Sequence, residues 1–138
     1  MALKTTTIKQ KVFIPAKPAE VYDAYINAKK HEAFTGAKAT CLAKAGGKFT
    51  AWDGYISGKN VNLVKGKNIV QEWKTTEWPD GFPPSKLDLT LAGKNGGTEI
   101  IMVHSLVPAQ QSASYKQGWK DFYWAPLRKY FKNISSAK

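Results

Sequence analysis

The sequence predicts an α+β fold in which a curved antiparallel sheet wraps around one long C-terminal helix, with two short helices after the first strand. The first observation is that apolar and polar residues alternate between glycine-containing turns through residues 37–108. The second is a helical stripe of large apolar side chains within residues 112–133. Such a stripe is stable only where a sheet buries it, because each aromatic side chain can remove roughly 150 to 250 Å² from water. We expect a single domain over residues 1–138, with its core over residues 5–133.

The N-terminal third is predicted to contain one strand and two short helices. Residues 5–14 alternate between apolar and polar side chains, which indicates a half-buried strand. Pro18 favours the first position of a helix over residues 18–27, because a backbone N–H at that position would have no acceptor within the helix. A second helix over residues 29–34 is expected to end at Gly36.

The middle of the chain predicts an antiparallel meander. Six strands joined by glycine-containing turns are expected over residues 39–43, 48–52, 55–64, 69–75, 87–91 and 98–107. The last of these strands is apolar on both sides, so we expect it to be central in the sheet or covered on both faces. Three prolines make residues 78–84 the longest irregular segment.

The C-terminal helix is predicted to present one broad apolar face to the sheet. The residues of that face are Trp119, Phe122, Tyr123, Leu127, Tyr130 and Phe131. Pro126 lies inside the helical pattern, where its ring crowds the carbonyl four residues earlier, so a bend is expected over residues 122–126.

The charge indicates an acidic partner. Lys and Arg number 21 against 10 Asp and Glu, which gives a formal net charge of +11. Arg128 is the only arginine. Proteins that recognise specific bases favour the guanidinium group for contacts with base edges, so specific recognition of nucleic acid is not expected. The lysines are spread over the whole chain, so a solvated surface and a docking surface both remain open. No apolar run is long enough for a membrane span, and we expect a cytoplasmic monomer.

The sequence contains no motif of a catalytic or metal site. Cys41 is the only cysteine, and His31 and His104 are the only histidines, so no metal ligand set and no cofactor are predicted. No nucleophile elbow and no phosphate-binding loop is present. We therefore predict no catalytic residue. The alternative is a hydrolase or isomerase that uses a cavity, with Asp53 or Glu72 as a lone general base.

A set of mostly aromatic residues could line a ligand cavity between the sheet and the last helix. The candidates are Phe49, Trp52, Trp73, Met102, His104, Trp119 and Tyr123. The alternative is that they form ordinary close-packed core. His104 and Tyr123 would supply the polar groups of such a cavity.

Several segments resemble one known family in order and spacing. They are EAFT at 32–35, GGKF at 46–49, DGYISG at 53–58, IVQEWK at 69–74, WPDG at 78–81 and QGW at 117–119. Together they resemble the C-terminal domain of the activator of heat shock protein 90 ATPase, which belongs to the START-like, helix-grip superfamily (SRPBCC). The resemblance covers residues 8–131. It implies a helix-grip fold with an apolar cavity under the last helix.

The resemblance also implies a function, namely a co-chaperone of the stress response that binds a heat shock protein 90 type chaperone and favours its ATP hydrolysis. Candidate partner contacts are Lys48 and Lys74 on the basic surface and Trp78 and Phe82 in the irregular loop. Alternatively, the two aromatics fold back over the open end of the sheet. The alternative functions are carriage or sensing of a small hydrophobic ligand, and non-specific binding of polyanions.

Overall fold

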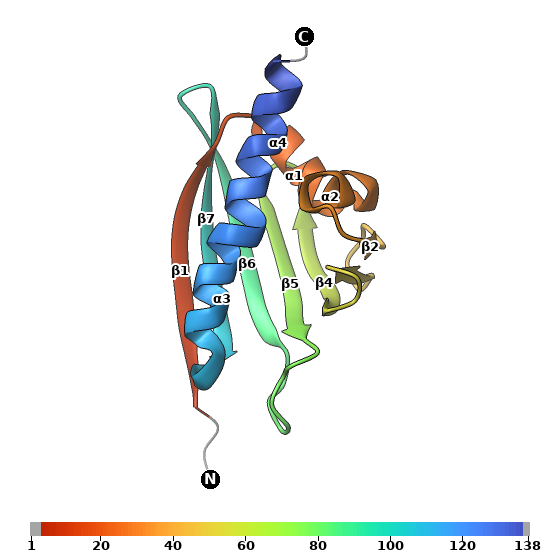
Figure 1. Cartoon of the computed structure of the whole chain (residues 1–138), viewed down its shortest axis with the longest axis vertical. Helices are drawn as coiled ribbons and strands as arrows, with labels where there is room; N and C mark the ends of the chain where they lie inside the picture. The colour runs from red at the N-terminus through yellow and green to blue at the C-terminus, as the bar shows by residue number, and fades with distance from the viewer. Residues whose placement is uncertain (1–3, 137–138) are drawn as a thin grey trace.

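The protein is an α+β domain, as predicted, in which a seven-stranded antiparallel sheet curves around a long C-terminal helical segment. A computed structural model describes residues 4–136, and Figure 1 shows the C-terminal helical segment lying along one face of the sheet. Two short helices, α1 (Pro18–Ile26) and α2 (Ala28–Thr35), lie beside the upper part of that segment. The other face of the sheet carries no helix among the described residues.

Strands β2 to β7 form a meander, and β1 pairs with β7 at one edge of the sheet. Its strands are β1 (Thr5–Ile14), β2 (Thr40–Cys41), β3 (Lys48–Ala51), β4 (Ile56–Val64), β5 (Asn68–Thr75), β6 (Ser85–Lys94) and β7 (Gly97–Pro108). Their order is β1-β7-β6-β5-β4-β3-β2, and every neighbouring pair is antiparallel. The short edge strand β2 ends the sheet on one side, which limits the unpaired backbone there.

Two strand predictions need correction in their bounds, and the first is β2, which was predicted over residues 39–43 but spans only Thr40–Cys41. Strand β6 was predicted over residues 87–91 but spans Ser85–Lys94, because its ladder with β7 continues to the tight turn at Asn95 and Gly96. Strand β7 is an internal strand, as one alternative predicted, but it is covered on one face only. Its alternate side chains are buried under the helices, whereas those of the opposite face, such as Val103, are half-buried.

The two short helices begin and end where their capping residues dictate. Pro18 lies in the first turn of α1. The side chain of Asn27 accepts a hydrogen bond from the backbone N–H of Lys30 at 3.1 Å, which caps α2. Gly36 ends α2 with φ of 79°, a conformation that other residues rarely adopt. The predicted helices are therefore confirmed to within one or two residues.

The C-terminal segment changes its helical type along its length. It consists of the 3-10 turn η1 (Ala109–Gln111), α3 (Ser112–Trp119), the π-helical η2 (Lys120–Trp124) and α4 (Ala125–Ser136). Where a bend was predicted over residues 122–126, the structure has a π turn over Lys120–Trp124, in which the backbone N–H of Ala125 donates to the carbonyl of Lys120. The last helix ends at Ser136, three residues beyond the predicted end.

The π turn also changes which side chains reach the core. Trp119, Tyr123 and Leu127 are buried as predicted, but Phe122 is 54% exposed and Trp124 is buried in its place. An extra residue per turn shifts the helical spacing, so a regular 3.6-residue repeat does not hold across residues 120–124. The predicted apolar face is therefore wrong at Phe122.

Candidate functional site

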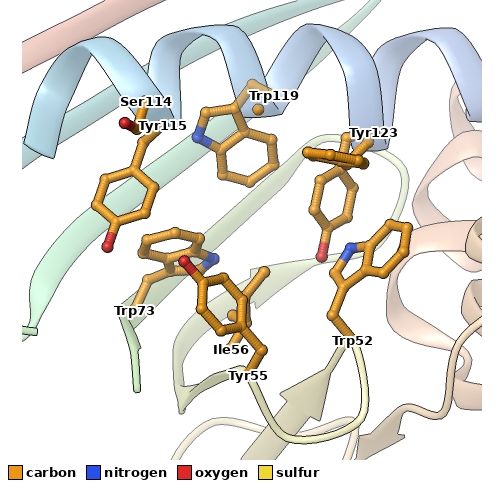
Figure 2. A pocket seen from close by; sticks show the side chains of 10 residues that line it. Trp52, Tyr55, Ile56, Trp73, Ser114, Tyr115, Trp119 and Tyr123 are labelled. Atoms are coloured by element: carbon orange, nitrogen blue, oxygen red, sulfur yellow. The ribbon is translucent and has the colours of Figure 1, made fainter. Parts of the chain in front are cut away.

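The main pocket lies between the C-terminal helical segment and the turn that joins β3 to β4. Its volume is about 450 Å³, which lies within the range of small-molecule sites. Figure 2 shows aromatic rings from the helix, the turn and the strands facing one another across it. The lining residues are Trp52, Tyr55, Ile56, Trp73, Ser114, Tyr115, Gly118, Trp119, Phe122 and Tyr123. None of these residues carries a formal charge.

Four of the seven predicted cavity residues line this pocket, namely Trp52, Trp73, Trp119 and Tyr123. Phe49, Met102 and His104 lie outside the lining. Met102 and His104 are fully buried on β7, and the C-terminal helical segment covers that part of the sheet. Phe49 is buried beside a much smaller gap near α2.

Six lining residues were missed by the prediction. Tyr55 and Ile56 follow the turn after β3, while Ser114, Tyr115, Gly118 and Phe122 come from the helical segment. Tyr115, Gly118, Trp119 and Phe122 recur at spacings of three and four residues, which places them on one helical face. That spacing was a usable signal for the helical side of the pocket.

A chain of hydrogen bonds fixes the tautomer of His104. The indole N–H of Trp119 donates to Nδ1 of His104 at 3.1 Å, so Nδ1 carries no proton. The proton of the neutral imidazole is therefore on Nε2, which lies 2.7 Å from Oγ of Ser85. The Ser85 hydroxyl in turn donates to the carbonyl of Trp73 at 2.6 Å. Burial lowers the pKa of His104 to about 3.

This geometry bears on the enzymatic alternative. A Ser–His contact of 2.7 Å resembles the nucleophile and base of a hydrolase. Here, however, Nε2 donates to the serine and has no free lone pair with which to accept the hydroxyl proton. The Ser85–His104 pair is therefore arranged to join β6, β7 and the helix, and it is not arranged for proton abstraction from Ser85.

His31 anchors the other end of the pocket. Its Nδ1 lies 2.9 Å from the carbonyl of Tyr25 and carries the proton, so Nε2 accepts the hydroxyl hydrogen of Tyr123 at 3.2 Å. Burial lowers the pKa of His31 and raises the pKa of Tyr123, so both groups are neutral at pH 7. The Tyr123 ring is thereby fixed at the wall of the pocket.

The hydroxyl of Tyr115 is also engaged. It lies 2.6 Å from the hydroxyl of Thr75 and donates to Oε1 of Gln111 at 2.9 Å. Burial raises the pKa of Tyr115 to about 12, so it remains a neutral phenol. On the opposite side of the pocket, the hydroxyl of Tyr55 donates to the carboxylate of Glu77 at 3.0 Å.

Two indole N–H groups of the lining lack a partner. Within the described part of the chain, Nε1 of Trp52 and Nε1 of Trp73 are buried and have no hydrogen-bond acceptor. Trp52 also has a φ of 53°, and Asp53 after it has 59°. A bulky residue in the left-handed region is strained, and such strain is concentrated at functional sites.

The candidate partner lysines lie on the uncovered face of the sheet. Lys48 pairs directly with Lys59 of β4, and this row continues to Glu72 and Lys86 on β5 and β6. We call these four residues the lysine row. Lys74 lies two residues from Glu72 on the same face. The lysines are exposed, and within residues 4–132 none of them forms a salt bridge.

Trp78 and Phe82 belong to the loop between β5 and β6. The Trp78 ring packs against Trp73 and Tyr115, with centroid distances of 6.1 and 6.0 Å, and its N–H donates to the carbonyl of Pro83 at 2.9 Å. Trp78 thus folds back against the end of the sheet, which is the packing alternative. Phe82 is half-buried.

Among the residues that the structure describes, no group of three His, Cys, Asp or Glu side chains is arranged to hold a metal ion. No helix in the same region has both the length and the apolar character to cross a membrane.

Comparisons with known proteins identify relatives of the whole fold. The sequence model of the family described as Activator of Hsp90 ATPase homolog 1-like protein matches residues 15–132. The human protein named Activator of 90 kDa heat shock protein ATPase homolog 1 is 35% identical over 129 residues, which are 94% of this chain and 38% of the human one. A homologue from Dictyostelium discoideum is 33% identical over 84% of this chain and 30% of its own length. The chain thus spans less than two fifths of these relatives.

Solved structures show the same fold. An Hsp90 activator from Plasmodium falciparum superposes with a TM-score of 0.81 at 21% identity, covering 93% of this chain and 96% of that one. The structure described as the Aha1 dimer from Colwellia psychrerythraea gives 0.73 at 16% identity, covering 85% and 90%. The predicted helix-grip arrangement is confirmed. Because the family model covers most of the chain, the protein belongs to the Activator of Hsp90 ATPase homolog 1-like family.

Proposed function

We propose that the protein is a non-catalytic co-chaperone that binds a heat shock protein 90 type chaperone and favours the conformations in which that chaperone hydrolyses ATP. The observation that carries this proposal is the 35% identity to the human activator across 94% of the chain. The proposal assigns the ATPase chemistry to the partner. The Ser85–His104 pair is consistent with it, because His104 is not arranged to take the hydroxyl proton of Ser85.

We assign the chaperone contact to the uncovered face of the sheet. Lys48 and Lys59 are direct cross-strand neighbours, and like charges in that position destabilise a sheet. One acidic residue, Glu72, lies beside Lys59 in the row, so the local charge stays positive. An acidic surface on the partner would offset the repulsion and steer the encounter.

The test is the double charge reversal Lys48→Glu/Lys59→Glu, with Lys129→Glu/Lys132→Glu on α4 as the matched control. Both pairs change the net charge equally, and all four lysines are exposed. Exposed ion pairs contribute about 0.2 to 1 kcal/mol each, so reversing two of them is expected to weaken chaperone binding roughly tenfold. Binding is measured by calorimetry at low and high salt, and ATP turnover is measured in parallel.

The control pair is expected to weaken binding by less than about twofold, because long-range repulsion is screened within roughly 10 Å. Equal losses in the two variants would mean that only the overall charge matters, and the assignment to the lysine row would be wrong. If the wild-type protein neither binds the chaperone nor changes its ATP turnover, the co-chaperone function itself is refuted.

A second candidate function is carriage or sensing of a small hydrophobic molecule. It is favoured by a pocket of about 450 Å³ whose lining is mostly aromatic. A pocket of this size is large enough to hold a small molecule. The two functions use different parts of the fold, the outer face of the sheet and the pocket beneath the helix, and they are compatible.

A further inference from the structure

The two edges of the sheet differ in length. On one side β2 presents two residues, whereas on the other side β1 presents ten. Figure 1 shows β1 at the left of the sheet, with no other described helix or strand beyond it. A long edge strand carries a row of backbone N–H and C=O groups that can pair with another extended segment. The edge of β1 is therefore where the sheet can accept a further strand.

The register of the sheet decides which backbone groups of β1 point outward. The two-residue turn between β6 and β7 is flanked by Lys94 and Gly97, which therefore form a hydrogen-bonded pair. Because bonded and non-bonded pairs alternate, the odd-numbered residues of β7 bond to β6 and the even-numbered ones bond to β1. Lys9, Lys11 and Phe13 pair with odd-numbered residues, so their N–H and C=O groups point away from the sheet.

One of these outward groups is already bonded. The guanidinium Nε of Arg128 donates to the carbonyl of Phe13 at 2.9 Å, which agrees with the outward direction of that carbonyl. No hydrogen bond within residues 4–136 engages the backbone N–H or C=O of Lys9 or Lys11. The backbone groups of both lysines are therefore open to a further strand.

The side chains along this edge are basic and have no acidic partner in the ladder. The Lys9 and Lys11 side chains lie on the uncovered face of the sheet and are exposed. Their cross-strand neighbours on β7 are Val103 and Ile101, so neither lysine faces a carboxylate. Among the residues that the structure describes, neither lysine forms a salt bridge. Both charges are hydrated and accessible to a partner.

Two further basic residues, from the C-terminal helical segment, lie beside β1. The side-chain amide of Gln10 donates to the carbonyl of Lys116 at 2.9 Å, and Arg128 is held against the strand by the contact described above. The side chains of Lys116 and Arg128 are both exposed. The one carboxylate of β7, Glu99, is already paired with Lys94 at 3.1 Å. The local charge at this edge is therefore positive.

A second copy of this chain fits the edge poorly. Two β1 edges paired with each other would bring lysines close to lysines, and like charges across a ladder destabilise it. Lysine on an edge strand is a common means of preventing such self-pairing. A segment with acidic residues at alternate positions fits better, because it pairs with the open backbone groups and places a carboxylate beside each lysine.

We infer that the edge of β1 binds an extended segment of a partner protein, which joins the sheet as an antiparallel strand and places two acidic side chains against Lys9 and Lys11. Antiparallel pairing is expected because parallel ladders are slightly less stable per residue. In chain order, the segment carries an apolar residue opposite Phe13, an acidic residue opposite Lys11 and another opposite Lys9, with one residue of any kind between them. The inference is independent of the co-chaperone function, whose contact was assigned to the lysine row on β3 to β6.

The test uses the peptide acetyl-SVTETETS-amide, in which the valine faces Phe13 and the two glutamates face Lys11 and Lys9. One control peptide has lysine in place of both glutamates. A second control keeps the glutamates but carries a methyl group on each of their backbone nitrogens, which removes the donors to the open carbonyls of β1. In ¹H–¹⁵N spectra, the acidic peptide should move the amide signals of Lys9 and Lys11 downfield and slow their exchange with deuterium. Each control should bind at least about fivefold more weakly, because the first loses the ion pairs and the second loses hydrogen bonds.

Two variants at one position separate the backbone donor from the charge. Lys11→Pro removes an outward N–H that the ladder with β7 does not use, and proline is tolerated at such edge positions. Lys11→Thr is the matched control, because it removes the same charge but keeps the N–H. Lys11→Pro should bind the acidic peptide at least about threefold more weakly than Lys11→Thr. The comparison of the three peptides on the wild-type protein needs no variant and stands if Lys11→Pro fails to fold.

Each other occupant of the edge predicts its own result. Equal binding of the acidic peptide and its N-methylated form would mean that charge alone attracts polyanions to this edge, and the added strand would be refuted. If the amides of Lys9 and Lys11 are protected without peptide and the protein sediments as a dimer, a second copy occupies the edge and the inference is wrong. Unchanged signals at millimolar peptide would overturn it as well. The co-chaperone function is tested separately, by titration with the chaperone.

Discussion

The buried histidine His104 should make the stability of the fold depend steeply on pH. Its side chain is fully buried, its two ring nitrogens are hydrogen-bonded to the uncharged side chains of Ser85 and Trp119, and its pKa is lowered to about 3 from the usual 6.5. The unfolded chain therefore binds a proton on this residue below pH 6.5, whereas the folded chain does so only near pH 3. The stabilisation is complete above pH 6.5 and is lost as the pH falls toward 3.

The magnitude follows from the pKa difference. Each pH unit between these two pKa values changes the unfolding equilibrium about tenfold, so acidification from pH 6.5 to pH 4 should cost roughly 3 kcal/mol through His104. The pKa of His31 is lowered as well, by burial, and adds an effect of the same sign. The loss should be visible as a falling urea midpoint.

The assay is urea unfolding, followed by tryptophan fluorescence, at a series of pH values between 7 and 4. The variant His104→Gln retains an amide that can bond to Ser85 and has no group that titrates in this range. Its overall stability will be lower. Its free energy of unfolding should nevertheless fall less steeply as the pH decreases, because about one proton fewer is bound on unfolding. If the two proteins show parallel pH profiles, His104 is not neutral in the fold, and the hydrogen-bond assignment around it is wrong.

Three further predictions concern packing. Leu127→Ala should cost about 2 to 5 kcal/mol in urea unfolding because its side chain is 99% buried, whereas Phe122→Ala should cost less than about 1; equal losses would contradict the π turn. Gly58→Ala should disrupt the pairing of β4 with β5, because a Cβ there would lie 1.8 Å from a β5 carbonyl oxygen, and an unchanged circular dichroism melt would refute this. Gln10→Leu should cost about 1 to 3 kcal/mol in the same urea assay by leaving the indole N–H of Trp124 without its acceptor, unless that bond is absent.

The order and type of the elements were predictable because their physical signals are local. Alternation with period two, glycine turns and the caps at Pro18 and Gly36 each act within a few residues. The short length of β2 was not predictable, because strand length at a sheet edge depends on how far the neighbouring strand extends. The role of Gln10 was likewise hidden, since its partners Trp124 and Lys116 are more than 100 residues away.

The pocket was predictable in part, from the aromatic composition of the chain. The sequence pointed to Trp52, Trp73, Trp119 and Tyr123, which do line it. It could not show that the π turn would move Phe122 to the mouth of the pocket, because a π turn has no clear sequence signature beyond the proline that follows it.

The buried polar groups were the least predictable part of the site. His104 was placed in the cavity because it continued the apolar alternation of β7, but a fully buried imidazole needs its own acceptors and donors. Ser85 and Trp119 supply them, from 19 and 15 residues away. Such pairings depend on the register of β6 with β7 and on the rotation of the helix, neither of which a single sequence specifies.

The most direct test of the proposed function is an amide chemical-shift titration of the ¹⁵N-labelled protein with the heat shock protein 90 type chaperone of its own source organism, with ATP turnover read in parallel. The proposal predicts changes on the outer face of β3, β4 and β5, around Lys48, Lys59 and Lys74, together with altered turnover. The signals of the pocket should stay in place. No shifts and unchanged turnover would contradict the co-chaperone function, and shifts confined to the pocket would contradict the proposed docking face.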